Sequence, residues 1–195
     1  MSFAKNKYQV IRQAIPKDLA NFVMNYFLLQ QDAVAYMLKN NIINKHNPLI
    51  GNWEDEQVPN AYSKYGDWVM ETLLQYVRPI MKEKTKLDLI PTYSYARIYN
   101  KGNILKKHKD RPSCEISTTL NLGGNHWSIY LEGIKVDLQQ GDMLIYSGCE
   151  LEHWREPFEG DFCVQVFLHY NHANGKFGKE NLFDKRPILG IPKNG

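Results

Sequence analysis

After Pro91 the hydrophobic pattern changes from helical spacing to alternation, and it stays that way through Tyr170. Because alternate side chains of a strand point to the same side, the first expected strand has one face made of Tyr93, Tyr95, Arg97 and Tyr99. Further short strands, each ended by a turn signal, are expected at 105–109, 116–122, 127–131, 134–138, 143–146 and 162–170. Many short strands separated by turns are typical of a sandwich or barrel-like roll.

Two helices are expected before this region, over residues 17–39 and 63–86, because apolar residues recur there at helical spacing. Pro79 lies inside the second helix and predicts a kink or break. The expected fold class is therefore mainly β (α+β), with the N-terminal helices packed on one face of the roll. The tail from residue 171 is loop-like, and Phe177, Leu182 and Phe183 are available to pack back as a lid or a structural wrap.

The 195 residues are enough for one domain with a sizeable core. We expect a single domain over 1–195, with a helical part at about 1–90, the β core at about 91–170 and a tail at 171–195. The net charge of +3 is too small to indicate nucleic acid or an anionic membrane as a partner.

The three cysteines are odd in number and form no close-spaced pair, so we expect reduced thiols and no disulfide framework. No apolar run is long enough to span a bilayer. The first residues, MSFAKNKYQV, lack the apolar core of a signal peptide. A cytoplasmic location is the expectation.

His108 and Asp110 are the strongest candidates for metal ligands. Residues two apart on a strand face the same side, so this imidazole and this carboxylate can reach one point while Lys109 turns away. They supply two-thirds of the 2-His-1-carboxylate triad that binds non-haem Fe(II). An isolated H-x-D motif also fits a surface histidine beside a charge, so its context has to decide.

A third ligand is expected further along the chain, and His153 is the best placed. We expect it on a late strand that neighbours the strand of His108, so that both strand ends open at the same mouth of the roll. The alternative for His153 is a surface histidine beside Glu152. The weaker third-ligand candidates, near a hairpin or at the far end of the last strand, are His126, His169 and His172.

Together these motifs resemble the 2-oxoglutarate- and Fe(II)-dependent oxygenase superfamily, in its prolyl-4-hydroxylase-like branch. The resemblance rests on Arg97-Ile98-Tyr99-x-x-Gly102, His108-x-Asp110, Leu120-Asn121-Leu122, Gln140-Gly141-Asp142 before Tyr146, and His153. The strings HKDRPSCEIS and HWREPFEGD are similar to those of small single-domain proteins of marine bacteria and their phages. The composite is specific, although no single motif is.

This resemblance implies a double-stranded β-helix, folded as a jelly roll. It implies Fe(II) bound by His108, Asp110 and His153, with 2-oxoglutarate chelating the iron as co-substrate; ascorbate is a candidate further cofactor. The implied reaction hydroxylates a C–H bond with O₂ and converts 2-oxoglutarate to succinate and CO₂.

The family binds the distal carboxylate of 2-oxoglutarate with an Arg or Lys about ten residues after the third ligand, but here the stretch 162–165 has no cation. A buried carboxylate without a partner is costly, so another cation is expected. Arg155 is the first candidate, because it follows His153 on the same strand face and its fork suits a carboxylate. Its alternative role is a surface ion pair with Glu152 or Glu156. The second candidate is Arg97, and hydrogen bonds are expected from Tyr99, Thr119 and Gln165.

Three functions remain open at this point. The first is a hydroxylase acting on a peptidyl residue such as proline. The second is a small-molecule oxygenase of the same fold and metal. The third is a non-catalytic, cupin-like roll that binds a metal. The expected partner is accordingly a peptide or a small molecule, with no nucleic acid and no membrane; the sequence does not indicate an oligomeric state.

Overall fold

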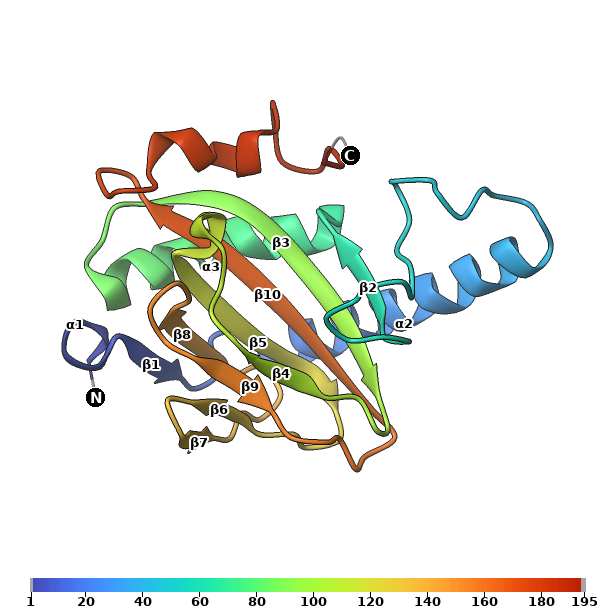
Figure 1. Ribbon diagram of the computed structural model, residues 1–195, viewed down its shortest axis with the longest axis horizontal. Coiled ribbons are helices and arrows are strands. Elements are labelled where there is room, and N and C mark those ends of the chain that lie inside the picture. Colours follow the sequence, from blue (N-terminus) through green and yellow to red (C-terminus); the bar gives the residue numbers. More distant parts are fainter. Residues whose placement is uncertain (1, 194–195) are drawn as a thin grey trace.

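The strands form two antiparallel sheets in this computed structural model, which describes residues 2–193 (Figure 1). The larger sheet contains, in order across it, β1 (Tyr8–Ile11), β8 (Met143–Ser147), β5 (Ile116–Gly124), β10 (Phe162–His172), β3 (Leu89–Asn100) and β2 (Tyr62–Tyr65). The smaller sheet contains β4 (Leu105–His108), β9 (His153–Arg155), β6 (Ile129–Leu131) and β7 (Ile134–Val136). This two-sheet arrangement, with helices at its N-terminal end, confirms the predicted jelly-roll class.

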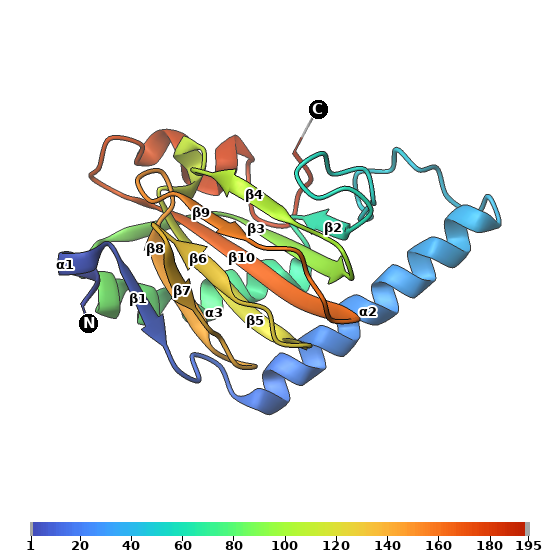
Figure 2. The same cartoon turned by 60° about the horizontal axis from the view of Figure 1, so that its bottom comes forward.

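The helices α2 (Lys17–Lys39) and α3 (Trp68–Thr85) pack on the larger sheet, while the smaller sheet lies on its other side (Figure 2). α2 has the predicted bounds. α3 begins later than predicted, because 62–65 form β2 and the Asp67 carboxylate then caps the helix by accepting from the backbone N–H of Val69 at 2.9 Å. A short helix, α1 (Phe3–Asn6), precedes β1.

The predicted break at Pro79 is absent, and α3 continues through this residue to Thr85. Proline removes one backbone donor, which leaves the carbonyl four residues earlier, that of Gln75, without its helical partner. Gln75 lies on the exposed side of the helix, where water can replace that partner. Within residues 2–193, no helix combines the length and the apolarity needed to cross a membrane.

The three central strands of the larger sheet are apolar toward the helices and polar or aromatic toward the smaller sheet. The core against the helices includes Ala96, Ile98, Leu120, Leu122, Val164, Val166 and Leu168. The alternate residues therefore face the space between the two sheets. Since a slip of one residue would exchange the two faces, this core fixes which side chains can form a site.

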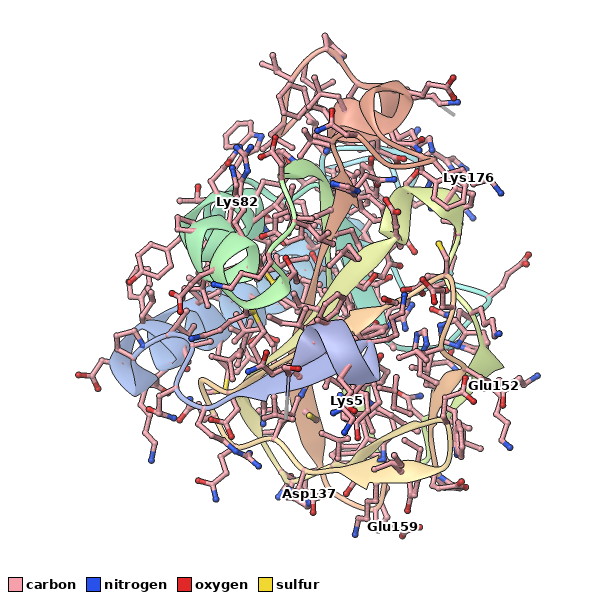
Figure 3. The ribbon with its side chains drawn as sticks, turned by 90° about the vertical axis from the view of Figure 1, so that its left-hand side faces the viewer. Lys5, Lys82, Asp137, Glu152, Glu159 and Lys176 are labelled. Carbon is pink, nitrogen blue, oxygen red and sulfur yellow. The ribbon has the colours of Figure 1, made fainter. Side chains whose placement is uncertain are left out.

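Charged side chains of both signs lie on the outside of the molecule. Figure 3 shows Asp137 and Glu159 at the lower edge of the view and Lys176 at the upper right. All three are exposed. The small net charge of +3 thus arises from acids and bases that both reach the surface.

The C-terminal tail is held on the molecule by a buried and a partly exposed ion pair, and Leu182, which was available to pack back, is 41% exposed. Arg186 donates to the Glu71 carboxylate of α3 at 2.6 Å, and both side chains are 3% exposed. Asp184 accepts two hydrogen bonds from Arg111, at 3.0 and 2.8 Å, and one from the Tyr65 hydroxyl at 2.8 Å. These contacts make the tail a structural wrap.

We expect Glu71→Gln to lower the free energy of unfolding by about 3–5 kcal/mol, because the substitution leaves the buried Arg186 guanidinium without its counter-charge. Urea unfolding monitored by tryptophan fluorescence would measure the change. Glu83→Gln, on the exposed side of the same helix, is the matched control. A loss below about 1 kcal/mol for Glu71→Gln would contradict a structural role for this pair.

Candidate metal centre

His108 and His153 meet because their two short strands pair with each other. β4 and β9 are antiparallel neighbours, and their register sets His108 directly opposite His153. Side chains directly opposite each other on adjacent strands lie on the same face, and the two imidazole centroids are 4.2 Å apart. The predicted neighbourhood of these two strands is therefore present.

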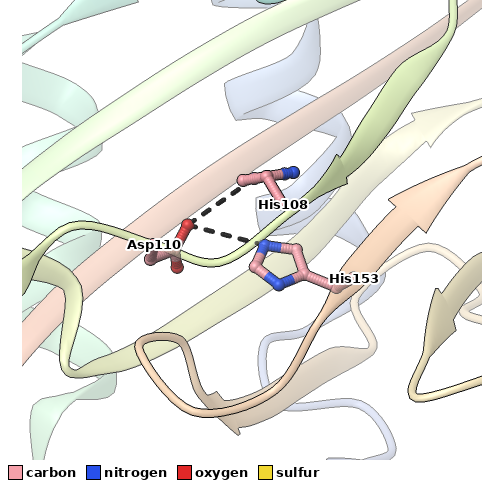
Figure 4. A group of neighbouring side chains, drawn as sticks. All are labelled: His108, Asp110 and His153. Atoms are coloured by element: carbon pink, nitrogen blue, oxygen red, sulfur yellow. Dashed lines mark ion pairs between the residues drawn. The ribbon is translucent and has the colours of Figure 1, made fainter.

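Asp110, just beyond the end of β4, completes a cluster of three ligand-type side chains (Figure 4). Its Oδ1 lies 3.5 Å from His153 Nε2 and 3.7 Å from His108 Nε2, and the ligand atoms of all three lie within 4.8 Å of one another. Imidazole and carboxylate ligands lie about 2.1 Å from a divalent ion, so two at right angles are about 3 Å apart. Small side-chain movements would suffice to hold one ion.

Both imidazoles present the same nitrogen to the centre. His108 Nδ1 lies 2.8 Å from the carbonyl of Lys106, and His153 Nδ1 lies 3.0 Å from the carbonyl of Leu151. A carbonyl only accepts, so each Nδ1 carries the proton and each Nε2 offers a lone pair toward Asp110. Burial lowers the pKa of His108, which favours the neutral imidazole that a metal needs.

The Asp110 carboxylate is oriented by its surroundings. Burial alone would raise its pKa, but the Ser117 hydroxyl that donates to it helps to hold the pKa below the usual value. Ser117 Oγ donates to Oδ2 at 2.8 Å, and the Asp110 amide donates to the carbonyl of Gly148 at 2.9 Å. A side chain at Gly148 would place its Cβ 2.3 Å from Oδ2, so only glycine permits this approach.

His169 lies near the far end of the last strand, as predicted, and this position places it beside the centre. β10 runs antiparallel to β5 and pairs His169 with Ser117. His169 Nδ1 is 2.9 Å from the Ser117 oxygen, and burial lowers the pKa of His169 to about 4. The neutral imidazole thus supports the serine that orients Asp110. His126 instead pairs with Asp137 at 3.1 Å, on an exposed edge.

We expect Ser117→Ala to lower the metal affinity by about 10–100-fold, the usual cost of losing a partner that orients a ligand. Titration with Co(II) or Ni(II) would measure it. The matched control is Thr118→Val, the next residue on β5, whose buried hydroxyl has no hydrogen-bond partner. Equal affinities in both variants would show that Ser117 does not position Asp110.

Arg155 is 1% exposed, and so does not form the surface ion pair considered for it. Its NH1 donates to the carbonyl of Trp127 at 2.5 Å and its NH2 to Thr119 Oγ1 at 3.4 Å, while its Nε has no partner. Thr119 in turn donates to Gln165 Oε1 at 3.0 Å. Across residues 2–193, no carboxylate oxygen lies within 4.0 Å of this guanidinium. A buried cation without a counter-charge fits a site for an incoming carboxylate.

Arg97 differs from Arg155 in having a counter-charge already. It is 2% exposed and donates to the Asp55 carboxylate, to Gln57 Oε1 at 3.1 Å and to the Tyr99 hydroxyl at 3.2 Å. Of the two predicted anchor cations, Arg155 is therefore the one that lacks an anion.

A cavity of about 330 Å³ opens at the histidine–aspartate cluster, and its wall includes His108, Asp110, His153, His169 and Arg97. Among the residues that the structure describes, Tyr146 also lines the cavity, whereas Arg155 does not. The cavity thus gives access to the cluster from one side. Asp55, Gln57 and Ser117 are the neighbours that the sequence reasoning missed, whereas it considered His169 only as a weaker third ligand. The alternation of β10, which places His169 on the same face as Gln165, is a signal that could have indicated its position beside the centre.

No protein-family model matches the chain, and no curated protein matches it. Solved structures do. A prolyl-4-hydroxylase from Pseudomonas putida is 14% identical, with 87% of this chain and 95% of that chain covered and a TM-score of 0.59. HygX from Streptomyces hygroscopicus, solved with nickel and 2-oxoglutarate, is 10% identical over 88% and 85% of the two chains, with a TM-score of 0.59.

A prolyl hydroxylase from Trichoplax adhaerens, solved with a peptide fragment of hypoxia inducible factor, is 12% identical over 88% of this chain and 86% of that chain, with a TM-score of 0.59. At these identities the likeness concerns the fold. The chain has the jelly-roll fold of the 2-oxoglutarate- and Fe(II)-dependent oxygenases, and at that level the resemblance stated from its sequence is confirmed.

Proposed function

We propose that this protein is a 2-oxoglutarate- and Fe(II)-dependent dioxygenase that hydroxylates a C–H bond. The observation that carries the proposal is the convergence of two Nε2 lone pairs and one carboxylate at the wall of a cavity. Three protein ligands leave an Fe(II) ion with open positions. The fold shared with solved oxygenases supports the same reaction type.

In this proposal His108, Asp110 and His153 hold the iron. When bound, the iron supplies O₂ activation coupled to oxidative decarboxylation of 2-oxoglutarate, which is the chemistry that protein side chains lack. The two histidines keep their Nδ1 protons on backbone carbonyls throughout. Ser117 keeps Asp110 turned toward them. The chain's contribution is thus orientation of ligands rather than proton transfer.

Arg155 is the proposed anchor of the distal carboxylate of 2-oxoglutarate. An incoming carboxylate would supply the counter-charge that this buried guanidinium lacks, and its Nε is a free donor. Thr119 accepts a hydrogen bond from Arg155 and donates one to Gln165, so both are proposed to bind the same carboxylate. Tyr99, fully buried beside Arg97, is a proposed further hydrogen-bond donor.

The primary substrate is either a peptidyl residue or a small molecule. The Trichoplax enzyme was solved with a peptide, and HygX was also solved with hygromycin B, so the fold accommodates both. A cavity of about 330 Å³ is at the small end of the range for ligand pockets. It suits one side chain or a small ligand. A cytoplasmic location is part of the proposal, supported by three cysteines that are all free.

Incubation with Fe(II) and 2-oxoglutarate tests the proposal, because enzymes of this kind turn over slowly without a primary substrate. We expect succinate and CO₂ to form in equal amounts, above a blank that contains iron without protein. If the protein binds Fe(II) and 2-oxoglutarate yet forms no succinate above this blank, the non-catalytic metal-binding roll replaces the oxygenase.

A further inference from the structure

The cavity beside the metal centre contains a second polar site, formed by Arg97 and Tyr95 of β3. The Arg97 guanidinium lies between the Tyr95 and Tyr99 rings, 5.2 and 5.4 Å from their centroids. Arg97 NH2 and the Tyr95 hydroxyl both donate to one oxygen, Asp55 Oδ2. Two donors that converge on one oxygen in a cavity wall make a carboxylate-binding site.

The carboxylate in this site belongs to the chain itself. Asp55 lies in the irregular loop between α2 and β2, and its side chain is 16% exposed while that of Arg97 is 2% exposed. Arg97 Nε is buried and has no hydrogen-bond partner. The acid is therefore the movable member of the pair, and the arginine is the fixed one.

Gln57, two residues further along this loop, reaches the metal centre. Its Oε1 accepts from Arg97 at 3.1 Å, and its Nε2 lies 3.1 Å from His108 Nε2. Because His108 Nδ1 carries the proton, Nε2 accepts this hydrogen bond with the lone pair that an iron ion would need. Metal binding at His108 consequently requires Gln57 to move, and the same segment holds Asp55 on Arg97.

We propose that Asp55 and Gln57 form a displaceable plug, and that the primary substrate has a carboxylate that replaces Asp55 on Arg97 and Tyr95. The inference rests on the proposed function, in which iron occupies the histidine–aspartate cluster and Arg155 takes the co-substrate. Exchange of one carboxylate for another keeps the buried guanidinium compensated at every stage. A neutral ligand that displaced Asp55 would leave Arg97 with only water as a partner, at the cost of a buried charge without a counter-charge.

The plug also predicts an order of events. Loading of the metal breaks the hydrogen bond between Gln57 and His108, so the loop that carries Asp55 is then held by fewer hydrogen bonds. A carboxylate ligand should accordingly bind more tightly to the metal-loaded protein than to the metal-free protein.

The test uses N-acetylglycine as a carboxylate probe and N-acetylglycinamide as its neutral counterpart. The protein is loaded with Ni(II) and saturated with N-oxalylglycine, which occupies the 2-oxoglutarate site without turnover. Calorimetric titration of Asp55→Asn is expected to give a probe affinity at least 10-fold higher than that of the unmodified protein, with no gain for the amide. Glu54→Gln removes one negative charge from the same loop at an exposed position paired with Lys45, and should change nothing.

A second variant covers the case in which Asp55→Asn does not fold. Gln57→Ala removes the hydrogen bonds to Arg97 and His108 but retains the charges of Asp55 and Arg97. It should raise the affinity for the probe several-fold, and the affinity for the metal as well. Unchanged probe affinity in Asp55→Asn and Gln57→Ala would overturn the plug.

Two further outcomes separate the possible sources of the carboxylate. If the probe binds only when N-oxalylglycine is left out, Arg97 takes the co-substrate, and the inferred class of primary substrate is wrong. If Ni(II) and N-oxalylglycine themselves fail to bind, the proposed function fails. In that case, titration of the metal-free variants Asp55→Asn and Glu54→Gln with N-acetylglycine still decides on the carboxylate site.

Discussion

His108→Ala should abolish succinate formation and lower the affinity for Fe(II) or Ni(II) by more than about 100-fold. The expectation follows because the substitution removes one of the three side chains whose ligand atoms converge at the centre, whereas loss of an outer partner costs about 10–100-fold. His108 is half-buried at the end of β4, so its truncation should leave the fold intact. Calorimetric metal titration and a succinate assay measure the two effects.

The matched control is His46→Ala, which removes an exposed imidazole in the loop after α2. It should retain full metal affinity and activity. Retained succinate formation by His108→Ala would remove His108 from the metal centre and, with it, the proposed ligand set. Loss of succinate with unchanged metal affinity would point to a role in turnover other than metal binding.

The convergence of the three candidate ligands was predictable because the signal is local and periodic. His108 and Asp110 are two positions apart at the end of one strand, and the register of β4 and β9 brings His153 opposite the first of them. The alternation in β3 likewise placed Tyr93, Tyr95 and Arg97 on the face that lines the cavity. Because the side-chain period of a strand is two, the face on which a residue lies follows from its position along the strand.

The supporting residues were not predictable in the same way, because they depend on strand register and loop position. Ser117 and His169 meet through the pairing of β5 with β10, across more than fifty residues of chain. Gly148 matters only because the Asp110 carboxylate passes beside it. Asp55 and Gln57 lie in a stretch that reads as loop, where no periodicity indicates a direction. The edge strands β1 and β2 were missed, and residues 63–65 of β2 were assigned to the start of the second helix.

Arg155→Met should raise the apparent KM for 2-oxoglutarate by roughly 30-fold to several thousand-fold. Loss of one partner of a buried charge pair typically costs about 2–5 kcal/mol, and each 1.4 kcal/mol is a factor of ten. Arg155→Lys retains the charge without the planar fork of the guanidinium, so its KM should lie between those of the unmodified protein and Arg155→Met. An unchanged KM in Arg155→Met would move the anchor to Arg97.

Stability provides an independent measure of the same assignment. In the protein without co-substrate, Arg155 is a buried charge with no carboxylate partner within residues 2–193, and replacing such a charge with an apolar side chain of similar length is often neutral or stabilising. Arg155→Met should therefore have an unfolding free energy equal to or above that of the unmodified protein without ligand. It should also lose the stabilisation that N-oxalylglycine gives, since a ligand stabilises a fold only as far as it binds. A structural arginine would behave in the opposite way, because its removal would lower stability and leave ligand binding unchanged.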